Sequence, residues 1–366
     1  MTVKIPTHIR DLVPYRAGRS PDGRDSSTRF AKLSSNENPL GPSPLALQAM
    51  EREAVRSHVY PDPTAKILRE ALSRSLGVSA DRIVCANGSD AILEYAIMSF
   101  SEGNDEILTS EGTFIGLYVI AKKLGRTLRT VPLKDWGYDL DAIEAAIHER
   151  TKVIYLANPN NPTGTHVQAE RLRKFLAAVP DRILIILDEA YAEYALASPD
   201  YLDGAQCDQE NLLLLRTFSK VHGLAGLRVG FGITTPSLAE ALSKVKLPFE
   251  PSRIAQTAAT AAISDRDHLD AILSLNLEAK KLFRACFTSL KLEFVESLAN
   301  FFMIAFDTGE EAADFTDACA KRGLYVRHLP GFGIPRAVRI NTGTLEETTF
   351  AVDVIASVIQ EKGVHA

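Results

Sequence analysis

Between residues 82 and 215 the sequence repeats one pattern, in which a short apolar run is followed by a segment with helical spacing. The apolar runs cover residues 82–86, 106–109, 127–131, 152–156, 182–187 and 211–215. Short, continuous runs of β-branched residues and leucine are typical of strands that helices cover on both faces. The alternation of strands and helices therefore predicts an α/β fold with a mostly parallel, seven-stranded-type sheet.

The two ends of the chain have a different texture. Residues 1–45 are rich in proline and glycine, whereas residues after 250 combine long helical patterns with strands near 300–306 and 337–341. A chain of 366 residues allows roughly two domains. We expect an arm at 1–45 that joins the small domain, a large domain at 46–250, and a small α+β domain at 251–366.

Charge and composition exclude several classes of function. The chain has 41 basic and 46 acidic residues without a long run of either sign, so nucleic acid is not an expected partner. Its longest aliphatic stretch, residues 183–187, is far too short to span a membrane, which predicts a cytoplasmic protein. Neither the four cysteines nor the eight histidines show metal-ligand spacing, so no metal is expected.

Polar or glycine-rich residues follow four of the predicted strands. They occupy residues 87–90, 158–164, 188–191 and 216–220. Ligands of open parallel sheets bind beyond the carboxyl ends of the strands, so these segments are expected to face one crevice.

Single residues in these segments allow more than one interpretation. Residues 87–89 open a helix, which suits a phosphate group, but Ser89 or Asp90 could equally be an N-cap. Asp188 ends an apolar strand, so it is either ion-paired or directed at a ligand. Lys220 could be a Schiff-base amine or a surface lysine, and His222 beside it is interpreted as structural.

Other well-known motifs are absent from the sequence. The glycines at 223, 226 and 230 do not have dinucleotide-binding spacing, and neither a phosphate-binding P-loop nor G-x-S-x-G occurs. Hydride transfer, nucleotide hydrolysis and serine hydrolysis are therefore not supported.

Four motifs together resemble the pyridoxal-phosphate aminotransferases of the aspartate aminotransferase fold. They are NPNNPTG at 158–164, DEAY at 188–191, TFSK at 217–220 and GLAGLR at 223–228. LVPY at 12–15, KLSSNENP at 32–39 and YPDP at 60–63 resemble the histidinol-phosphate aminotransferase branch. The similarity extends from about residue 10 to about residue 358.

The resemblance implies a role for each matching residue. Lys220 would bind the cofactor aldehyde and move the substrate proton, while Asp188 would keep the pyridine nitrogen protonated. Tyr191 and Asn161 would donate hydrogen bonds to the phenolic oxygen of the cofactor. The cofactor phosphate would be held by Gly88, Ser89, Asp90, Thr217, Ser219 and Arg228.

Further residues are assigned to the substrate and to a second subunit. Phe114 would stack on the cofactor ring, and Arg339 would bind the substrate carboxylate. Tyr60 would reach the cofactor phosphate of the neighbouring subunit, which implies a homodimer with shared active sites. The residues expected near the substrate, or in support of Arg339, are Tyr15, Phe249 and Arg327.

The resemblance implies an amino donor and a 2-oxo acid as substrates, most simply histidinol phosphate and 2-oxoglutarate. An aromatic amino-acid aminotransferase, a threonine-phosphate decarboxylase-like lyase and a non-catalytic cofactor-binding protein are the alternatives. The chain departs from the branch at Ala91 and at residues 250–251. Glu250 would repel a phosphorylated substrate unless Arg253 or Arg336 intervened.

Overall fold

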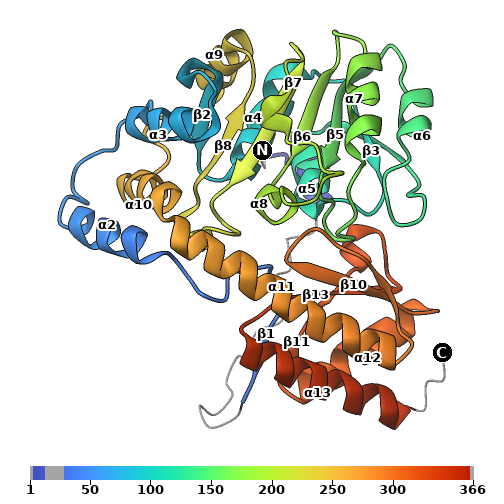
Figure 1. The fold of residues 1–366 in the computed structure, drawn as a ribbon. Helices are drawn as coiled ribbons and strands as arrows, with labels where there is room; N and C mark the ends of the chain where they lie inside the picture. The colour runs from blue at the N-terminus through green and yellow to red at the C-terminus, as the bar shows by residue number, and fades with distance from the viewer. Residues whose placement is uncertain (1–2, 13–28, 363–366) are drawn as a thin grey trace.

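A seven-stranded sheet forms the larger part of the computed structural model, which describes residues 3–12 and 29–362 (Figure 1). The spatial order of its strands is β2-β8-β7-β6-β5-β3-β4. Their bounds are β2 (Ile83–Ala86), β8 (Gly230–Ile233), β7 (Leu212–Thr217), β6 (Leu184–Asp188), β5 (Thr151–Ala157), β3 (Glu106–Ser110) and β4 (Thr127–Val131). Strand β8 pairs antiparallel with β2 and β7, and the other pairings are parallel.

The side chains of each central strand pack alternately into two hydrophobic cores. In β5, Ile154 and Leu156 belong to one core, whereas Val153, Tyr155 and Ala157 belong to the other. The first core is covered by α3 (Lys66–Leu76), α6 (Leu140–Ala145), α7 (Ala169–Ala178) and α10 (Arg253–Ser264). The second is covered by α4 (Ser89–Phe100), α5 (Ile115–Lys123) and α9 (Pro236–Val245). This double burial explains the continuous apolar runs.

Strand β8 has no counterpart among the predicted strands, because its sequence is short and contains two glycines. A Cβ atom on Gly230 would overlap the start of α4 and approach the Arg216 carbonyl oxygen to 3.0 Å. Glycine is required there because two backbone segments approach closely. Since glycine is not a hydrophobic residue, the apolar pattern of the sequence does not indicate this strand.

A smaller antiparallel sheet lies below the large one in Figure 1, with the strand order β12-β13-β10-β9. Its strands are β12 (Arg327–His328), β13 (Ala337–Asn341), β10 (Phe301–Ala305) and β9 (Glu293–Val295). Three helices pack on it, namely α11 (Arg266–Ser289), α12 (Gly309–Lys321) and α13 (Leu345–Lys362). The fold is therefore α/β, with a mostly parallel seven-stranded sheet covered by helices and a smaller α+β part.

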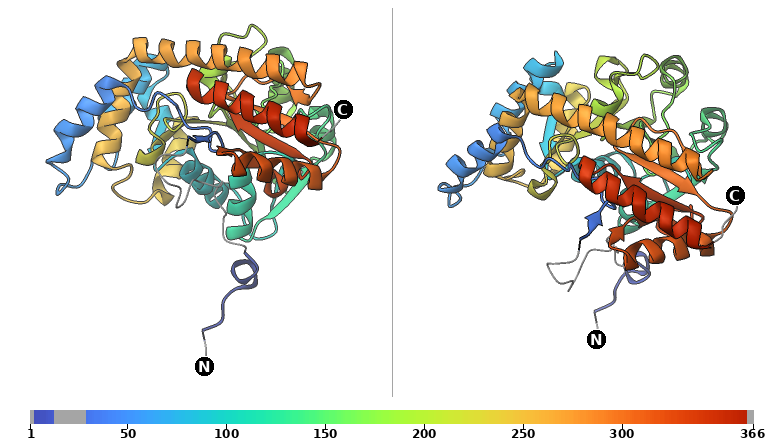
Figure 2. Two further views of the ribbon diagram at one scale, coloured as in Figure 1. Left: turned by 90° about the horizontal axis from the view of Figure 1, so that it is seen from below. Right: turned by 60° about the horizontal axis from the view of Figure 1, so that its bottom comes forward.

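Segments from both ends of the chain meet beside the small sheet. Strand β1 (Ala31–Lys32) pairs in parallel with β11 (Leu324–Tyr325), and α2 (Pro44–Ala54) then leads back to the large sheet. Helix α1 (Thr7–Arg10) lies against α5, and the residues before it extend away from the body (Figure 2). The domain boundaries at residues 45 and 250 stay predictions. Helix α10 follows the second of these boundaries, and four of its buried alanines pack into a core of the large sheet.

No helix in the described ranges is long and apolar enough to cross a lipid bilayer.

Candidate active site

The carboxyl ends of β5, β6 and β7 border a cavity of about 300 Å³. Ten of the residues expected around the cofactor line this cavity: Ser89, Asp90, Phe114, Asn161, Asp188, Tyr191, Thr217, Ser219, Lys220 and Arg228. The structure therefore brings the four polar strand ends together, because neighbouring parallel strands end at the same edge of the sheet.

One end of the cavity is formed by the start of α4 and the loop after β7. Gly88 precedes the helix with φ +94°, and a Cβ atom there would overlap Asp90 and Arg228. Arg228 Nη2 donates to Asp90 Oδ1 over 2.9 Å, and the hydroxyl groups of Thr217 and Ser219 lie 3.0 Å apart. Helix N–H groups without helical partners, two hydroxyl groups and an arginine are suited to a phosphate group.

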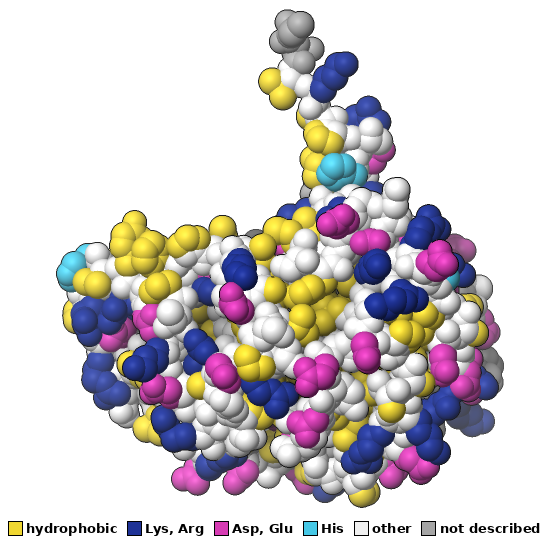
Figure 3. All heavy atoms as spheres, turned by 90° about the horizontal axis from the view of Figure 1, so that it is seen from above, with side chains coloured by type: hydrophobic (Ala, Val, Ile, Leu, Met, Phe, Trp, Pro, Cys, Tyr) yellow, Lys and Arg dark blue, Asp and Glu magenta, His cyan; other side chains and the backbone are white. Residues whose placement is uncertain are grey.

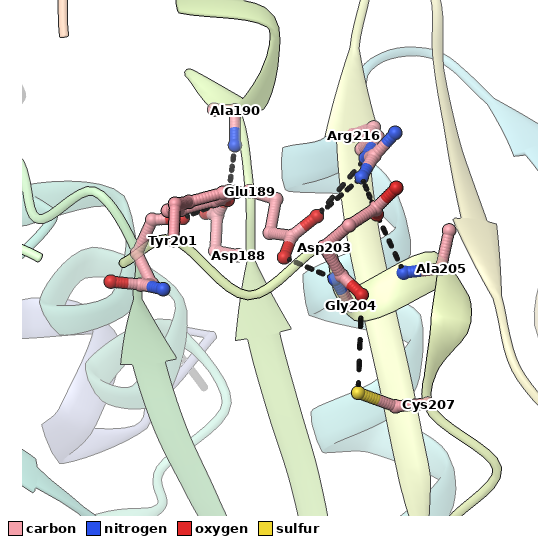
Figure 4. Close-up of polar contacts among 10 residues, drawn as sticks. Asp188, Glu189, Ala190, Tyr201, Asp203, Gly204, Ala205, Cys207 and Arg216 are labelled. Atoms are coloured by element: carbon pink, nitrogen blue, oxygen red, sulfur yellow. Dashed lines mark hydrogen bonds and ion pairs between the residues drawn. The ribbon is translucent and has the colours of Figure 1, made fainter. Parts of the chain in front are cut away.

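Asp188 also lines the cavity and is only 6% exposed. Its Oδ1 accepts from the Ala190 N–H over 3.1 Å, as Figure 4 shows, and its Oδ2 accepts from the Tyr155 hydroxyl over 2.7 Å. Burial raises the pKa of Asp188 to about 6, although both hydrogen bonds and Lys220 lower it. A buried carboxylate with neutral donors can bind a cationic ligand atom.

Two reactive side chains, Lys220 and Tyr191, line the same cavity. The Lys220 Nζ atom is 5.7 Å from the centre of the Tyr191 ring. The Tyr191 hydroxyl oxygen accepts from Asn36 Nδ2 over 2.7 Å, so its own proton is available for a ligand. Asn36 is buried and comes from the N-terminal arm, far from the other site residues in sequence. The sequence analysis missed it because no strand end marks its position.

A buried ion-pair network lies next to Asp188 and is formed by Glu189, Asp203 and Arg216 (Figure 4). Arg216 donates to Glu189 Oε2 through Nε at 3.1 Å and Nη2 at 2.7 Å, and to Asp203 Oδ1 at 2.5 Å. Glu189 Oε1 accepts from the Gly204 N–H over 2.8 Å. The three acids Glu189, Glu193 and Asp203 raise the pKa of Arg216 above its ordinary value. Sequence reasoning missed this network because Glu189 and Arg216 are 27 residues apart.

Two arginines of the small sheet face the same aromatic ring. Arg327 and Arg339 are directly opposite each other in the β12–β13 pair. Their guanidinium carbons lie 5.9 and 5.8 Å from the centre of the Phe332 ring. Arg339 also donates to Asn161 Oδ1 and to the Ser34 carbonyl oxygen. The Asn161 contact connects the small sheet to the cavity.

Tyr60 and Phe249 lie outside this cavity. Their rings stack with centres 4.3 Å apart, and they are 73% and 44% exposed. Exposed apolar side chains also gather at the left side of Figure 3, where α2 lies. Tyr15 lies outside the described residues.

The residues at the sequence departures do not face the cavity either. Glu250 is buried, and its carboxylate accepts from the Tyr95 hydroxyl over 2.6 Å. Arg253 is paired with Glu53 at 2.6 Å, and Arg336 lies over the Trp136 ring at 4.6 Å. Glu250 therefore does not place a negative charge in this cavity, and neither Arg253 nor Arg336 lines it.

His222 packs against an aromatic ring, which agrees with a structural role. Burial lowers its pKa to about 4, and its ring lies 5.0 Å from that of Phe218. The described residues contain no cluster of three or more metal-ligating side chains.

Comparison with known proteins gives one consistent family. Residues 28–355 match the aminotransferase class I and II family. The chain is 38% identical over 357 residues to histidinol-phosphate aminotransferase 1 of Nitrosococcus oceani, covering 96% of each chain. It is 40% identical over 359 residues to histidinol-phosphate aminotransferase 2 of Pseudomonas fluorescens, again covering 96% of each.

A solved structure agrees with these relatives. The crystal structure of histidinol-phosphate aminotransferase from Sinorhizobium meliloti, in complex with pyridoxal-5'-phosphate, superposes with a TM-score of 0.90. It shares 30% identity, and the match covers 99% of both chains. The chain therefore belongs to the class I and II aminotransferases, a family of transferases that depend on pyridoxal 5'-phosphate.

Proposed function

We propose that this enzyme transfers the amino group of histidinol phosphate to 2-oxoglutarate. The observation that carries the choice of donor is the pair formed by Arg327 and Arg339, directly opposite each other on adjacent strands. A phosphate group can accept charge-assisted hydrogen bonds from guanidinium groups on adjacent strands. Histidinol phosphate has a phosphate ester where an amino acid has its α-carboxylate. A phosphate group has three terminal oxygens to offer the two arginines, whereas the carboxylate of an aromatic amino acid has two.

The residues that line the cavity suit both the phosphate group and the ring of pyridoxal 5'-phosphate. Gly88 keeps the start of α4 clear of side-chain atoms, and Ser89, Thr217, Ser219 and Arg228 would hold the phosphate group. Asp188, which lines the same cavity, would offer a buried acid to a protonated pyridine nitrogen. When bound, the cofactor ring accepts the electron pair left when a bond at the substrate α-carbon breaks.

The protein side chains would transfer the proton, hold the cofactor ring and bind the substrate. Lys220 would carry the proton that leaves and re-enters at the α-carbon, since its amine borders the cavity. Asp188 would hold the proton on the pyridine nitrogen. Tyr191, whose oxygen already accepts from Asn36, would donate to the phenolic oxygen together with Asn161. Phe114 would pack against the ring, and Arg339 would orient Asn161 while binding the substrate anion.

Steady-state kinetics test the proposed donor. The purified enzyme, loaded with pyridoxal phosphate and supplied with 2-oxoglutarate, should give a much higher kcat/KM with histidinol phosphate than with phenylalanine. Arg327→Gln should reduce this preference about tenfold or more, because a hydrogen bond to a charged group contributes about 1.5–3 kcal/mol. Lys220→Ala is the control and should abolish turnover with both donors.

Other outcomes would contradict the assignment. A higher kcat/KM for phenylalanine would identify the enzyme as an aromatic aminotransferase. Release of carbon dioxide from threonine phosphate without keto-acid formation would instead indicate a lyase. Binding of the cofactor without any turnover would indicate a non-catalytic protein.

We further propose that the enzyme works as a homodimer in the cytoplasm. The exposed stack of Tyr60 and Phe249 supports a second copy, because two large rings on a surface are typical of an interface. Sedimentation should give twice the chain mass of 40.0 kDa.

Tyr60→Ala should weaken cofactor binding, because Tyr60 is expected to reach the cofactor phosphate of the neighbouring subunit. A fully active monomer would contradict the shared site. Cell fractionation tests the location, which the four free cysteines support.

A further inference from the structure

Tyr155 is a buried tyrosine of β5 whose hydroxyl group lies against the acid of the cavity. It donates to Asp188 Oδ2 over 2.7 Å, and its side chain is completely buried. Tyr155 borders the same cavity as Asp188 and Lys220. The roles proposed above do not use it, and its position inside the apolar run 152–156 gave no sign of a polar function.

In the described structure, the Asp188 carboxylate accepts two hydrogen bonds from the protein. The Ala190 N–H donates to one oxygen and Tyr155 to the other. Burial disfavours the ionised form of a carboxyl group, whereas donated hydrogen bonds favour it. A protonated carboxyl group could not keep a pyridine nitrogen protonated, so the donor to Asp188 matters for the chemistry.

We propose that Tyr155 is a positioning residue that acts through Asp188. Its hydroxyl group keeps the carboxylate ionised and in one orientation for the pyridine nitrogen of the cofactor. This inference rests on the proposed function, because it assigns Tyr155 a purpose only if a pyridine ring binds beside Asp188.

The other charged groups near Asp188 act less directly. Lys220, from the loop after β7, favours the ionised carboxylate, and Asp90, from α4, opposes it. The phenol groups of Tyr138 and Tyr191 lie near Tyr155 and oppose its own ionisation. In the described ranges, Tyr155 is the side chain that donates a hydrogen bond directly to the carboxylate.

Tyr138 provides a matched control in the same region. Its hydroxyl group is within 2.6 Å of Thr113 Oγ1 and accepts from the Ala157 N–H over 3.0 Å. It therefore contacts β5, the strand that carries Tyr155, without contacting an acid. Replacing either tyrosine with phenylalanine removes one oxygen atom, but only one of the two changes affects Asp188.

The experiment measures the dissociation constants of two probes at pH 6 and pH 8 for the wild type, Tyr155→Phe and Tyr138→Phe. The probes are pyridoxal phosphate and an analogue in which CH replaces the ring nitrogen. Loss of the hydroxyl group should increase the protonated fraction of Asp188 at pH 6 and leave the carboxylate largely ionised at pH 8. Relative to the wild type, Tyr155→Phe should weaken pyridoxal phosphate binding about tenfold more at pH 6 than at pH 8. The analogue and Tyr138→Phe should show no such difference.

Each alternative result has a distinct meaning. If Tyr155→Phe weakens both probes equally at both pH values, Tyr155 is merely structural and the proposal is wrong. If it has no effect, the proposal is also wrong. Normal binding of the analogue shows that the variant has folded. If the folded wild type does not bind pyridoxal phosphate at all, the proposed function itself fails.

Discussion

Asp188 and Glu189 are adjacent acids at the end of β6, but they face opposite sides of the sheet. Asp188 borders the cavity and has two neutral donors. Glu189 is 0% exposed and is bound through two nitrogen atoms of Arg216, which is itself 3% exposed. Successive strand residues point to opposite faces, so one residue step separates a binding acid from a structural one.

The difference lies in whether a cation of the protein already compensates the charge. Burial raises the pKa of Glu189 to about 7 even though Arg216 lowers it, and two nitrogen atoms of Arg216 bind one carboxylate oxygen, so the acid is engaged by the fold and not by a ligand. Asp188 has no such partner in direct contact within the described structure, and its burial costs stability until a cationic ligand atom binds. The following predictions test this contrast.

The largest effect is expected for Asp188→Ala. Without the acid, the pyridine nitrogen would lose its proton, and we expect kcat to fall by about three to four powers of ten. The phosphate end of the cavity is unchanged, so inorganic phosphate should still compete with the cofactor. Single-turnover kinetics check the rate, with Glu189→Gln as the neighbouring control. A near-normal rate for Asp188→Ala would show that the acid is only structural.

A smaller but global effect is expected for Glu189→Gln. Breaking a buried ion pair leaves Arg216 incompletely compensated, and the free energy of unfolding should fall by about 3–5 kcal/mol. Urea unfolding of the ligand-free protein measures this change. Glu170→Gln, which breaks an exposed pair with Lys174, should change it by less than about 1 kcal/mol. Equal losses for the two variants would remove the distinction between the buried and the exposed pair.

The smallest effect is a pH-dependent gain in stability for Asp188→Asn. The pKa of Asp188 is raised from 3.8 to about 6 in the folded protein, so the folded state holds this proton to higher pH than the unfolded state. The group therefore lowers stability as pH rises from about 4 to about 6. Relative to the wild type, ligand-free Asp188→Asn should gain about 2–3 kcal/mol between pH 4 and pH 7. A constant difference across this range would contradict the raised pKa.

Much of the site followed from local features of the sequence. The predicted strands ended where polar residues began, and parallel strands bring such ends to one edge. Ten of the residues that the family resemblance assigns to the cofactor line the cavity at this edge, and their roles stay predictions. Tyr155 was not predicted to have a polar role, because a polar group inside an apolar run has no local signature. The pair of Glu189 with Arg216 was not predicted either, because the two residues are 27 positions apart and only the folded sheet brings them together.

The pattern of apolar runs and polar strand ends determined the α/β class and the edge of the sheet where chemistry occurs. Burial on both faces imposes such a pattern on every central strand. Only the tertiary structure decided which acid faces the cavity, which arginine neutralises the other, and that Asn36 reaches Tyr191. These choices depend on contacts between segments far apart in the chain. Their energies come from desolvation and hydrogen bonding in the folded interior, which no short stretch of residues specifies.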